Sequence, residues 1–262
     1  MTENAAPSTR VALVTGAASG VGRALVMRLL AEGHSVVATD VQPIAGFDST
    51  SVHTIQADVR DPEAMRSAAE AAVHHFGGLD TVAAVAGVVR FASVLDMPDA
   101  DRDLVLGVNL IGVWNTVRAA LPALLDRGEG GRVVVCASVQ SVVGTAGLAA
   151  YTASKHAVVG FVKALALELA PYGITANAVS PASIDTPMAT GERTEEQLER
   201  IGATTPVGRF STAAEVAAAM AWVAGPETAY LTGANIVLDG GTSVVNVHAM
   251  QSDGTLPRLR LR

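Results

Sequence analysis

The chain has 262 residues, of which half are hydrophobic, and it carries a formal net charge of −7 with an isoelectric point near 5.3. Its length suits a single α/β domain over residues 1–262. Its acidic balance argues against nucleic acid or an anionic membrane as a partner. No uninterrupted apolar run reaches the roughly 18 residues of a membrane-spanning helix. The apolar surplus therefore predicts strands buried on both faces and further surface buried between subunits.

Two features predict a cytoplasmic location. The N-terminus, MTENAAPSTR, lacks the apolar core of a signal peptide. The single cysteine, Cys136, excludes an intrachain disulfide and fits a reducing compartment, and we expect it to be a small buried hydrophobe. His74 and His75 show no metal-ligand spacing, so we expect no metal site.

The first elements in chain order are a strand, a glycine loop and a helix. The apolar run Val11–Thr15 leads into GAASGVG, and residues 23–32 follow with helical apolar spacing. This arrangement places backbone N–H groups and a helix N-terminus against a pyrophosphate. A tight turn that requires glycine at positive φ is the structural alternative.

An acidic residue follows the second predicted strand, Ser35–Ala38. Asp40 lies about 20 residues beyond the glycine loop, where a carboxylate accepts hydrogen bonds from the adenosine ribose hydroxyls. It would repel a 2′-phosphate, and no Arg or Lys follows it before Arg60. The sequence thus predicts NAD(H) rather than NADP(H), with a solvated turn aspartate as the alternative.

An asparagine lies in the predicted helical run of residues 98–124, which is interrupted near Gly107. Asn is disfavoured inside helices, so we expect Asn109 to form a specific hydrogen bond or to satisfy the backbone at a kink. Before this run, we expect Asp61 to cap a helix. The earlier elements are a strand at Val52–Gln56, a helix at Pro62–Phe76 and a strand at Thr81–Ala86.

A serine, a tyrosine and a lysine follow the fifth predicted strand, Arg132–Ala137. Tyr151 and Lys155, at i and i+4, lie on one face of a helix predicted at Ala150–Leu169. A phenol has a pKa of roughly 10, and a nearby ammonium favours the phenolate. Ser138 can hydrogen-bond the same small oxygen atom. Such a site can move a proton on or off an alcohol or a carbonyl.

The remaining elements complete an alternation of strands and helices. The helix at Ala150–Leu169 is apolar on nearly all sides, which predicts contact with a partner subunit. The alternation predicts a doubly wound parallel sheet, a Rossmann fold of about seven strands with helices on both faces and ligands at the strand carboxyl ends. The later segments are a strand at Thr175–Ser180, a substrate lid at 186–206 with a helix at Thr194–Ile201, a helix at Ala213–Ala224 and a strand at Asn235–Leu238. The flexible ends are residues 1–9 and the tail 247–262, which either is disordered or docks on a neighbour.

Taken together, these residues resemble the short-chain dehydrogenase/reductase family, in its single-domain NAD-preferring branch. The resemblance lies in the order and spacing of Thr15–Gly22, Asp40, Asp58, Asn109, Ser138, Tyr151 and Lys155. The resemblance covers roughly residues 10–245. It implies that Tyr151 is the general acid/base, that Lys155 favours its phenolate and binds the nicotinamide ribose, and that Ser138 holds the substrate oxygen. It also implies that Asn109 supports a water for proton relay.

The resemblance implies a cofactor site and a substrate wall. The cofactor residues are Gly16, Ser19, Gly20, Val21, Gly22, Asp40, Asp58, Val59, Ala86, Gly87, Tyr151, Lys155, Pro181, Ile184 and Thr186. The substrate residues are Val89, Gln140, Val143, Leu148, Ala182, Ser183 and Met188, with Val88, Val142 and Gly147 beside them. A wall that is apolar apart from one amide suits a hydrophobic secondary alcohol or ketone, alicyclic or steroid-like. Arg90 either binds an anionic group or is a solvated loop residue.

Three positions depart from the family pattern. Ala84–Gly87 replaces the usual Asn-Asn-Ala-Gly, which removes a brace between strands, and Pro181–Ala182 replaces Pro-Gly, which narrows the pocket. The tail beyond Gly241 is long, and it could line a neighbour's pocket.

The predicted activity is NAD-dependent oxidation of a CH–OH group by a homotetramer. The alternatives are a 3-oxoacyl-acyl-carrier-protein reductase, which usually uses NADPH, a sugar epimerase, or a non-catalytic NAD(H)-sensing protein.

Overall fold

A parallel sheet of seven strands forms the centre of the molecule. The computed structural model describes residues 9–186 and 194–245. The strand order is β3-β2-β1-β4-β5-β6-β9, and all neighbouring strands are parallel, which confirms the predicted doubly wound sheet. The strands are β1 Val11–Thr15, β2 Ser35–Asp40, β3 Val52–Gln56, β4 Thr81–Ala84, β5 Arg132–Cys136, β6 Thr175–Pro181 and β9 Asn235–Leu238.

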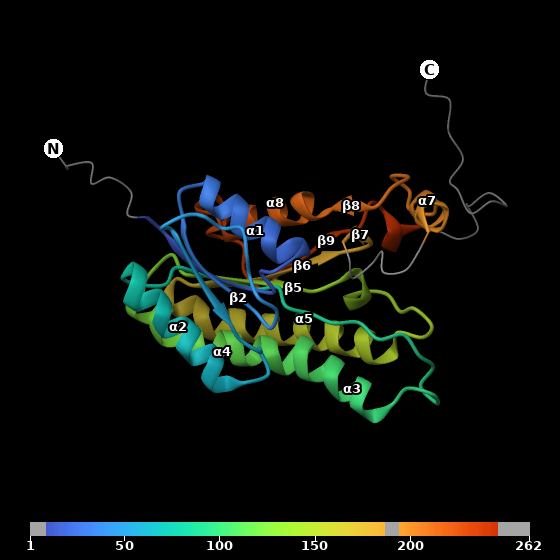
Figure 1. Cartoon of the computed structure of the whole chain (residues 1–262), viewed down its shortest axis with the longest axis horizontal. Helices are drawn as coiled ribbons and strands as arrows, with labels where there is room; N and C mark the ends of the chain where they lie inside the picture. Colours follow the sequence, from blue (N-terminus) through green and yellow to red (C-terminus); the bar gives the residue numbers. More distant parts are fainter. Residues whose placement is uncertain (1–8, 187–193, 246–262) are drawn as a thin grey trace, which may run out of the picture.

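Helices cover both faces of this sheet (Figure 1). On one face, α1 packs against α8; on the other, α2 packs against α4, with α5 beside them. The helix bounds are α1 Gly20–Ala31, α2 Pro62–Phe76, α3 Asp99–Leu106, α4 Gly112–Arg127, α5 Ala149–Leu169, α7 Glu195–Ala203 and α8 Ala213–Ala224.

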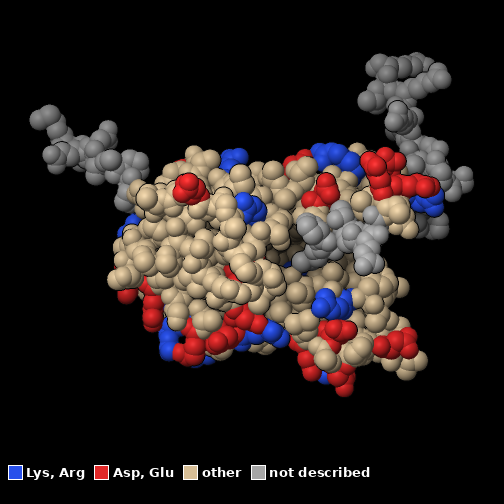
Figure 2. Space-filling view, in the orientation of Figure 1, with Lys and Arg blue, Asp and Glu red and all other residues tan. Residues whose placement is uncertain are grey.

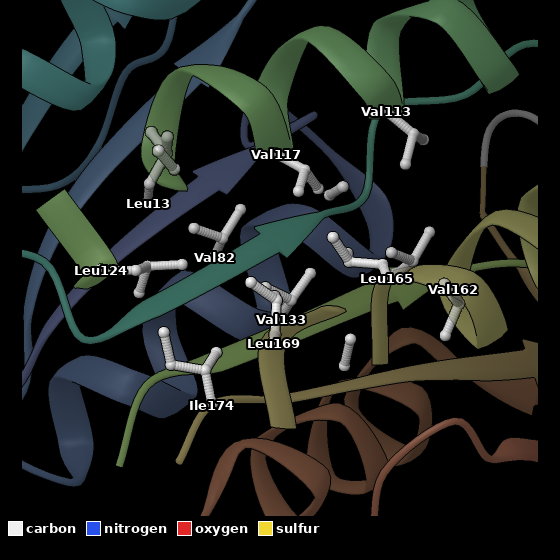
Figure 3. Packing of buried hydrophobic residues seen from close by; sticks show 14 of the residues in the cluster. Leu13, Val82, Val113, Val117, Leu124, Val133, Val162, Leu165, Leu169 and Ile174 are labelled. Atoms are coloured by element: carbon white, nitrogen blue, oxygen red, sulfur yellow. The ribbon is translucent and has the colours of Figure 1, made fainter. Parts of the chain in front are cut away.

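Successive residues of each central strand pack into different cores. Leu13 contributes to the cluster under α2, α4 and α5 (Figure 3), whereas Val14 contributes to the cluster under α1 and α8. Alternate side chains of a strand point to opposite faces, so both sets must be apolar when both faces are covered. This explains why the central strands are continuous apolar runs.

Side-chain caps fix several helix starts. The Asp61 carboxylate accepts hydrogen bonds from the N–H groups of Glu63 and Ala64, at 2.9 and 3.4 Å, as the sequence predicted. Thr194 and Thr212 form capping boxes at α7 and α8. The predicted short helix is thus present, whereas residues 187–193 of the predicted lid lie outside the described residues, as do residues 1–8 and 246–262.

One strand ends two residues earlier than predicted because of distant hydrogen bonds. Strand β4 ends at Ala84 rather than Ala86, since the Thr15 hydroxyl accepts the N–H groups of Val85 and Ala86, at 3.0 and 3.1 Å. The predicted interruption near Gly107 is confirmed and is a π-helical turn, Gly107–Ile111. A short parallel pair of β7, Ile184–Asp185, and β8, Ser211–Thr212, was not predicted.

One described helical run could cross a membrane by length and composition. The continuous run Asp99–Arg127 contains an 18-residue window with a mean hydropathy of 1.5, and half of that window is buried. Charged residues interrupt the run, so it is not an uninterrupted apolar stretch. In the structure this run packs on the sheet and on α2, and core helices of soluble proteins meet the same criterion.

Three histidines meet at the edge of the sheet beside the C-terminal end of α2. His53 on β3 stacks on His75, with ring centroids 3.9 Å apart, and His74 meets the edge of His75 at 4.9 Å. Burial lowers the pKa of His53 below its ordinary value, and the charges of His75 and His74 lower it further. Within the described ranges, no group of three or more His, Cys, Asp or Glu residues could hold a metal ion.

The lowered pKa of His53 predicts a pH-dependent stability. Because the unfolded chain binds the proton more readily than the folded chain, stability should fall as the pH drops below about 6.5. We expect the melting temperature to fall less between about pH 7.5 and about pH 5.5 in His53→Gln than in the wild type. Comparing the variant with the wild type at both pH values cancels the contribution of histidines outside this cluster. Equal losses in both proteins would contradict the prediction.

Candidate active site

A cavity of about 770 Å³ opens at the carboxyl ends of the sheet strands. The surface is hollowed between the α7 part and the α3 part of the face in Figure 2, and charged side chains gather mainly along its margins. All the predicted cofactor residues line this cavity, as do Ser138, Val89, Gln140, Leu148, Ala182 and Ser183. Asn109 and Val143 do not line it, and Met188 lies outside the described residues.

Helix α5 carries Tyr151 and Lys155 to the wall of the cavity. The Lys155 side chain, only 4% exposed, donates a hydrogen bond of 2.8 Å to the Cys136 carbonyl at the end of β5. Its ammonium lies 5.6 Å from the centroid of the Tyr151 ring. Helix spacing therefore brings a fixed positive charge close to a phenol at the edge of the sheet.

Ser138 enters the same cavity from the residues that follow β5. It caps the short helical turn Val139–Ser141, and its hydroxyl oxygen accepts the N–H of Gln140 at 3.2 Å. That contact orients the oxygen and leaves the hydroxyl hydrogen available as a donor. The hydroxyl can therefore donate to an oxygen atom bound in the cavity.

Asn109 is fully buried in the π-helical turn and behaves as a brace. Its amide accepts the N–H of Val88 at 2.8 Å, and it donates to the Val88 carbonyl at 2.9 Å and to the Ser154 hydroxyl at 3.1 Å. Ser154 in turn donates to the Tyr151 carbonyl. The specific hydrogen bonds expected of Asn109 are therefore present, and they go to Val88 and Ser154 rather than to the backbone of the π-helical turn. The brace links the loop after β4 to the part of α5 that carries Tyr151 and Lys155.

The glycine loop meets the requirements of both a tight turn and a close ligand approach. Gly16 and Gly20 have φ values of +71° and +52°. At Gly22 a Cβ would lie 2.0 Å from the Gly16 carbonyl oxygen, so no larger residue fits. Because Gly16, Ser19, Gly20, Val21 and Gly22 line the cavity, the start of α1 borders it, and these residues fit the phosphates of a dinucleotide.

The part of the cavity wall next to the glycine loop carries carboxylates. The Asp40 carboxylate accepts the N–H groups of Ala18 at 3.0 Å and Gln42 at 2.8 Å, which fixes it beside the glycine loop. Arg60, the first cation after Asp40 in the sequence, lines the cavity but forms an ion pair with Asp58 at 2.6 Å. This hydrogen bond lowers the pKa of the Asp58 carboxyl below its usual range.

Comparison with known proteins identifies the family. The family model described as enoyl-(acyl carrier protein) reductase, from the short-chain dehydrogenases, matches residues 16–243. A Mycobacterium tuberculosis protein named an uncharacterized NAD-dependent oxidoreductase is 34% identical in an alignment of 261 positions that covers 88% of this chain and 95% of that protein. The chain belongs to the short-chain dehydrogenase/reductase family. It is therefore an oxidoreductase by family.

Two further members of the family show how widely its substrates vary. The 3-oxoacyl-[acyl-carrier-protein] reductase of Escherichia coli is 34% identical, over 90% of this chain and 98% of its own. The ligand-free structure of an aldohexose dehydrogenase from Thermoplasma acidophilum is 29% identical and superposes with a TM-score of 0.85, covering 91% of this chain and 95% of that one. Family membership therefore leaves the substrate open.

Two polar side chains that were considered for substrate contact, Gln140 and Arg90, bond other residues of the protein. The Gln140 amide donates to the Thr145 hydroxyl at 2.8 Å and accepts from the Thr152 hydroxyl at 3.0 Å. Arg90 pairs with Asp101 at 3.1 Å, which agrees with its interpretation as a loop residue. Gln140 thus lines the cavity but acts as a link between the Ser138 turn and α5.

Several lining residues were missed from the sequence. They lie on loops, on the helical turn after β5 and on helices α3 and α7, and their place at the cavity depends on tertiary contacts. The signals in the sequence were a position after a strand end or within the predicted lid, and Leu104 had neither. Those that line the cavity are Phe91, Leu104, Val139, Thr145, Ile201 and Phe210.

Removing the Gln140 link should destabilise the fold. Gln140→Leu keeps a similar volume but leaves the Thr145 and Thr152 hydroxyls without this partner, so we expect a loss of about 1–3 kcal/mol in the free energy of unfolding. Denaturant unfolding measures it. The control is Gln42→Leu, at an exposed side chain. An equal effect in both variants would refute the role assigned to Gln140.

Proposed function

We propose that the protein interconverts a hydrophobic secondary alcohol and its ketone with NAD(H). The observation that supports this most directly is one cavity that joins Tyr151, Lys155 and Ser138 to the glycine loop and Asp40. An acid/base group, an oxygen-binding donor and a dinucleotide site are together what a dehydrogenase requires. Alicyclic and hydroxysteroid alcohols are the candidate substrates, because the wall beside Ser138 is largely apolar.

The proposed mechanism is general acid/base catalysis by Tyr151. Ser138 donates its hydroxyl hydrogen to the substrate oxygen, and the Tyr151 phenolate takes the proton from the alcohol. Lys155 stabilises the phenolate by its charge, and its remaining donors are free for a ribose hydroxyl. When bound, the nicotinamide ring supplies the carbon that accepts the hydride. Asn109 holds Val88 and Ser154 in place and supports a water-mediated proton path to Lys155.

The preference for NAD(H) is supported by Asp40 and by the name of the Mycobacterium tuberculosis relative. Asp40 lies in the cavity wall next to the glycine loop, where its charge would oppose a 2′-phosphate.

The lid over residues 186–206 and the contribution of the tail remain part of the proposal.

We also propose a homotetramer. Helices α4 and α5 expose large apolar side chains, among them Trp114 and Leu167, which is 78% exposed. The ring centroids of Trp114 and Phe161 lie 5.2 Å apart. Paired helices from two subunits would bury these side chains.

Two other functions stay under consideration. The Escherichia coli relative favours a 3-oxoacyl-[acyl-carrier-protein] reductase as the alternative reaction. A protein that binds NAD(H) without turnover is the alternative of a different class.

The role of Tyr151 is tested by Tyr151→Phe, which removes the phenol oxygen and keeps the ring. We expect turnover with NAD⁺ and secondary alcohols to fall at least about 100-fold, while the dissociation constant for NADH changes less than about twofold. NADH absorbance and fluorescence titration measure the two quantities. The exposed Tyr230→Phe is the matched control. A wild type that binds NADH but oxidises no alcohol would support the binding protein instead.

The role of Asp40 is tested by Asp40→Asn, which keeps an acceptor oxygen and removes the charge. The wild type should prefer NAD⁺, and the variant should narrow the ratio of kcat/KM for NAD⁺ over NADP⁺ by about tenfold, the effect of roughly 1.4 kcal/mol. Asp48→Asn, in an exposed part of the following loop, should leave the ratio unchanged. A wild type that uses NADP⁺ equally well would overturn the assignment.

A further inference from the structure

The loop between β4 and α3 carries three large apolar side chains that are mostly exposed. Phe91 is 71% exposed, Val94 81% and Leu95 93%. Of the three, Phe91 lines the cavity and the other two do not. The loop therefore brings one aromatic ring to the mouth of the candidate active site.

Phe91 is positioned by direct contact with Gly147. A Cβ on Gly147 would lie 2.5 Å from Cε1 of the Phe91 ring, and Gly147 has a φ of +81°. The N–H of Ala92 also donates to the Gly147 carbonyl at 3.0 Å. Glycine is thus required at 147 both by its backbone conformation and by the ring that rests on it.

Polar bonds hold the rest of this loop. Arg90 bonds the Val89 carbonyl at 2.9 Å and pairs with Asp101, while the Ser93 hydroxyl donates to the Asp96 carboxylate at 2.6 Å. The position of the Phe91 ring is therefore set without the ring being buried. A side chain held in this way gains its apolar burial only when another group covers it.

The surroundings indicate what that group would be. Leu148, which follows Gly147, lines the cavity, as do Val89 and Val139. The Gln140 amide bonds Thr145 through one N–H and Thr152 through its oxygen. The described wall next to Phe91 is largely apolar, and it would favour a ring-shaped hydrocarbon body over a short chain because the larger body covers more of it.

We propose that Phe91, resting on Gly147, is a specificity-determining residue that selects alcohols with a cyclic apolar body. This inference rests on the proposed alcohol dehydrogenase activity. The ring of Phe91 forms one wall of the substrate site, and the reacting carbon of the substrate lies deeper, toward Ser138 and Tyr151.

The test compares cyclohexanol with isopropanol in the wild type, Phe91→Ala and Val94→Ala, with NAD⁺. We expect Phe91→Ala to lower kcat/KM for cyclohexanol by about 10- to 100-fold and to change kcat/KM for isopropanol by less than about threefold. Val94→Ala removes a comparably exposed apolar side chain of the same loop outside the cavity, so both values should stay near those of the wild type. Gly147→Ala should reproduce the selective loss, because its Cβ displaces the ring.

A selective loss in Phe91→Ala with unchanged NADH affinity and circular dichroism supports the inference. The inference alone is overturned if Phe91→Ala loses kcat/KM equally for both alcohols or loses none. It is also overturned if Val94→Ala loses as much as Phe91→Ala, or if the wild type oxidises isopropanol and not cyclohexanol. A wild type that binds NADH and oxidises neither these nor any other secondary alcohol of an aliphatic, cyclic, aryl and steroid panel overturns the proposed function and the inference with it.

Discussion

The hydrogen bond from the Lys155 ammonium to the Cys136 carbonyl connects the two halves of the candidate site. It joins the N-terminal third of α5 to the last residue of β5. A buried ammonium is costly unless its donors are satisfied, and this bond uses one donor of three. Tyr151 lies one helical turn before Lys155, and Ser138 lies two residues after Cys136. Asn109 bonds Ser154, the residue next to Lys155. Their arrangement depends on the registration of α5 against β5.

The sequence predicted those parts of the fold that local patterns encode. The apolar runs marked the sheet strands, Asp61 marked a helix start and Gly107 marked an irregular turn, because each signal lies within a few residues. The end of β4 was misplaced because Thr15, 70 residues away, supplies the bond that ends it. Phe91 was not predicted to line the cavity for the same reason, since its neighbour Gly147 lies 56 positions further along the chain. The lid over residues 186–206 and the tail stay predictions.

Residue types in a pocket do not show which of their polar atoms are free. Gln140 was assigned to the substrate because it is the amide in an apolar wall, yet both ends of that amide bond to threonines. Arg90 is likewise paired with Asp101. The structure therefore shows which polar atoms of the wall already form bonds within the protein. Ser138 differs from both, because the contact that orients its oxygen leaves its hydrogen available.

The π-helical turn at Gly107–Ile111 constrains how this chain can change over evolutionary time. A π turn contains one more residue than an α turn, and each residue of an α-helix advances the direction of side chains by about 100°. Deleting one residue would yield a regular and locally more favourable helix. It would also rotate Asn109 relative to α4, so that the side chain could no longer reach Val88 and Ser154 while α4 kept its packing on the sheet. Insertions and deletions should therefore be rare in this segment, although substitutions on its exposed side remain possible.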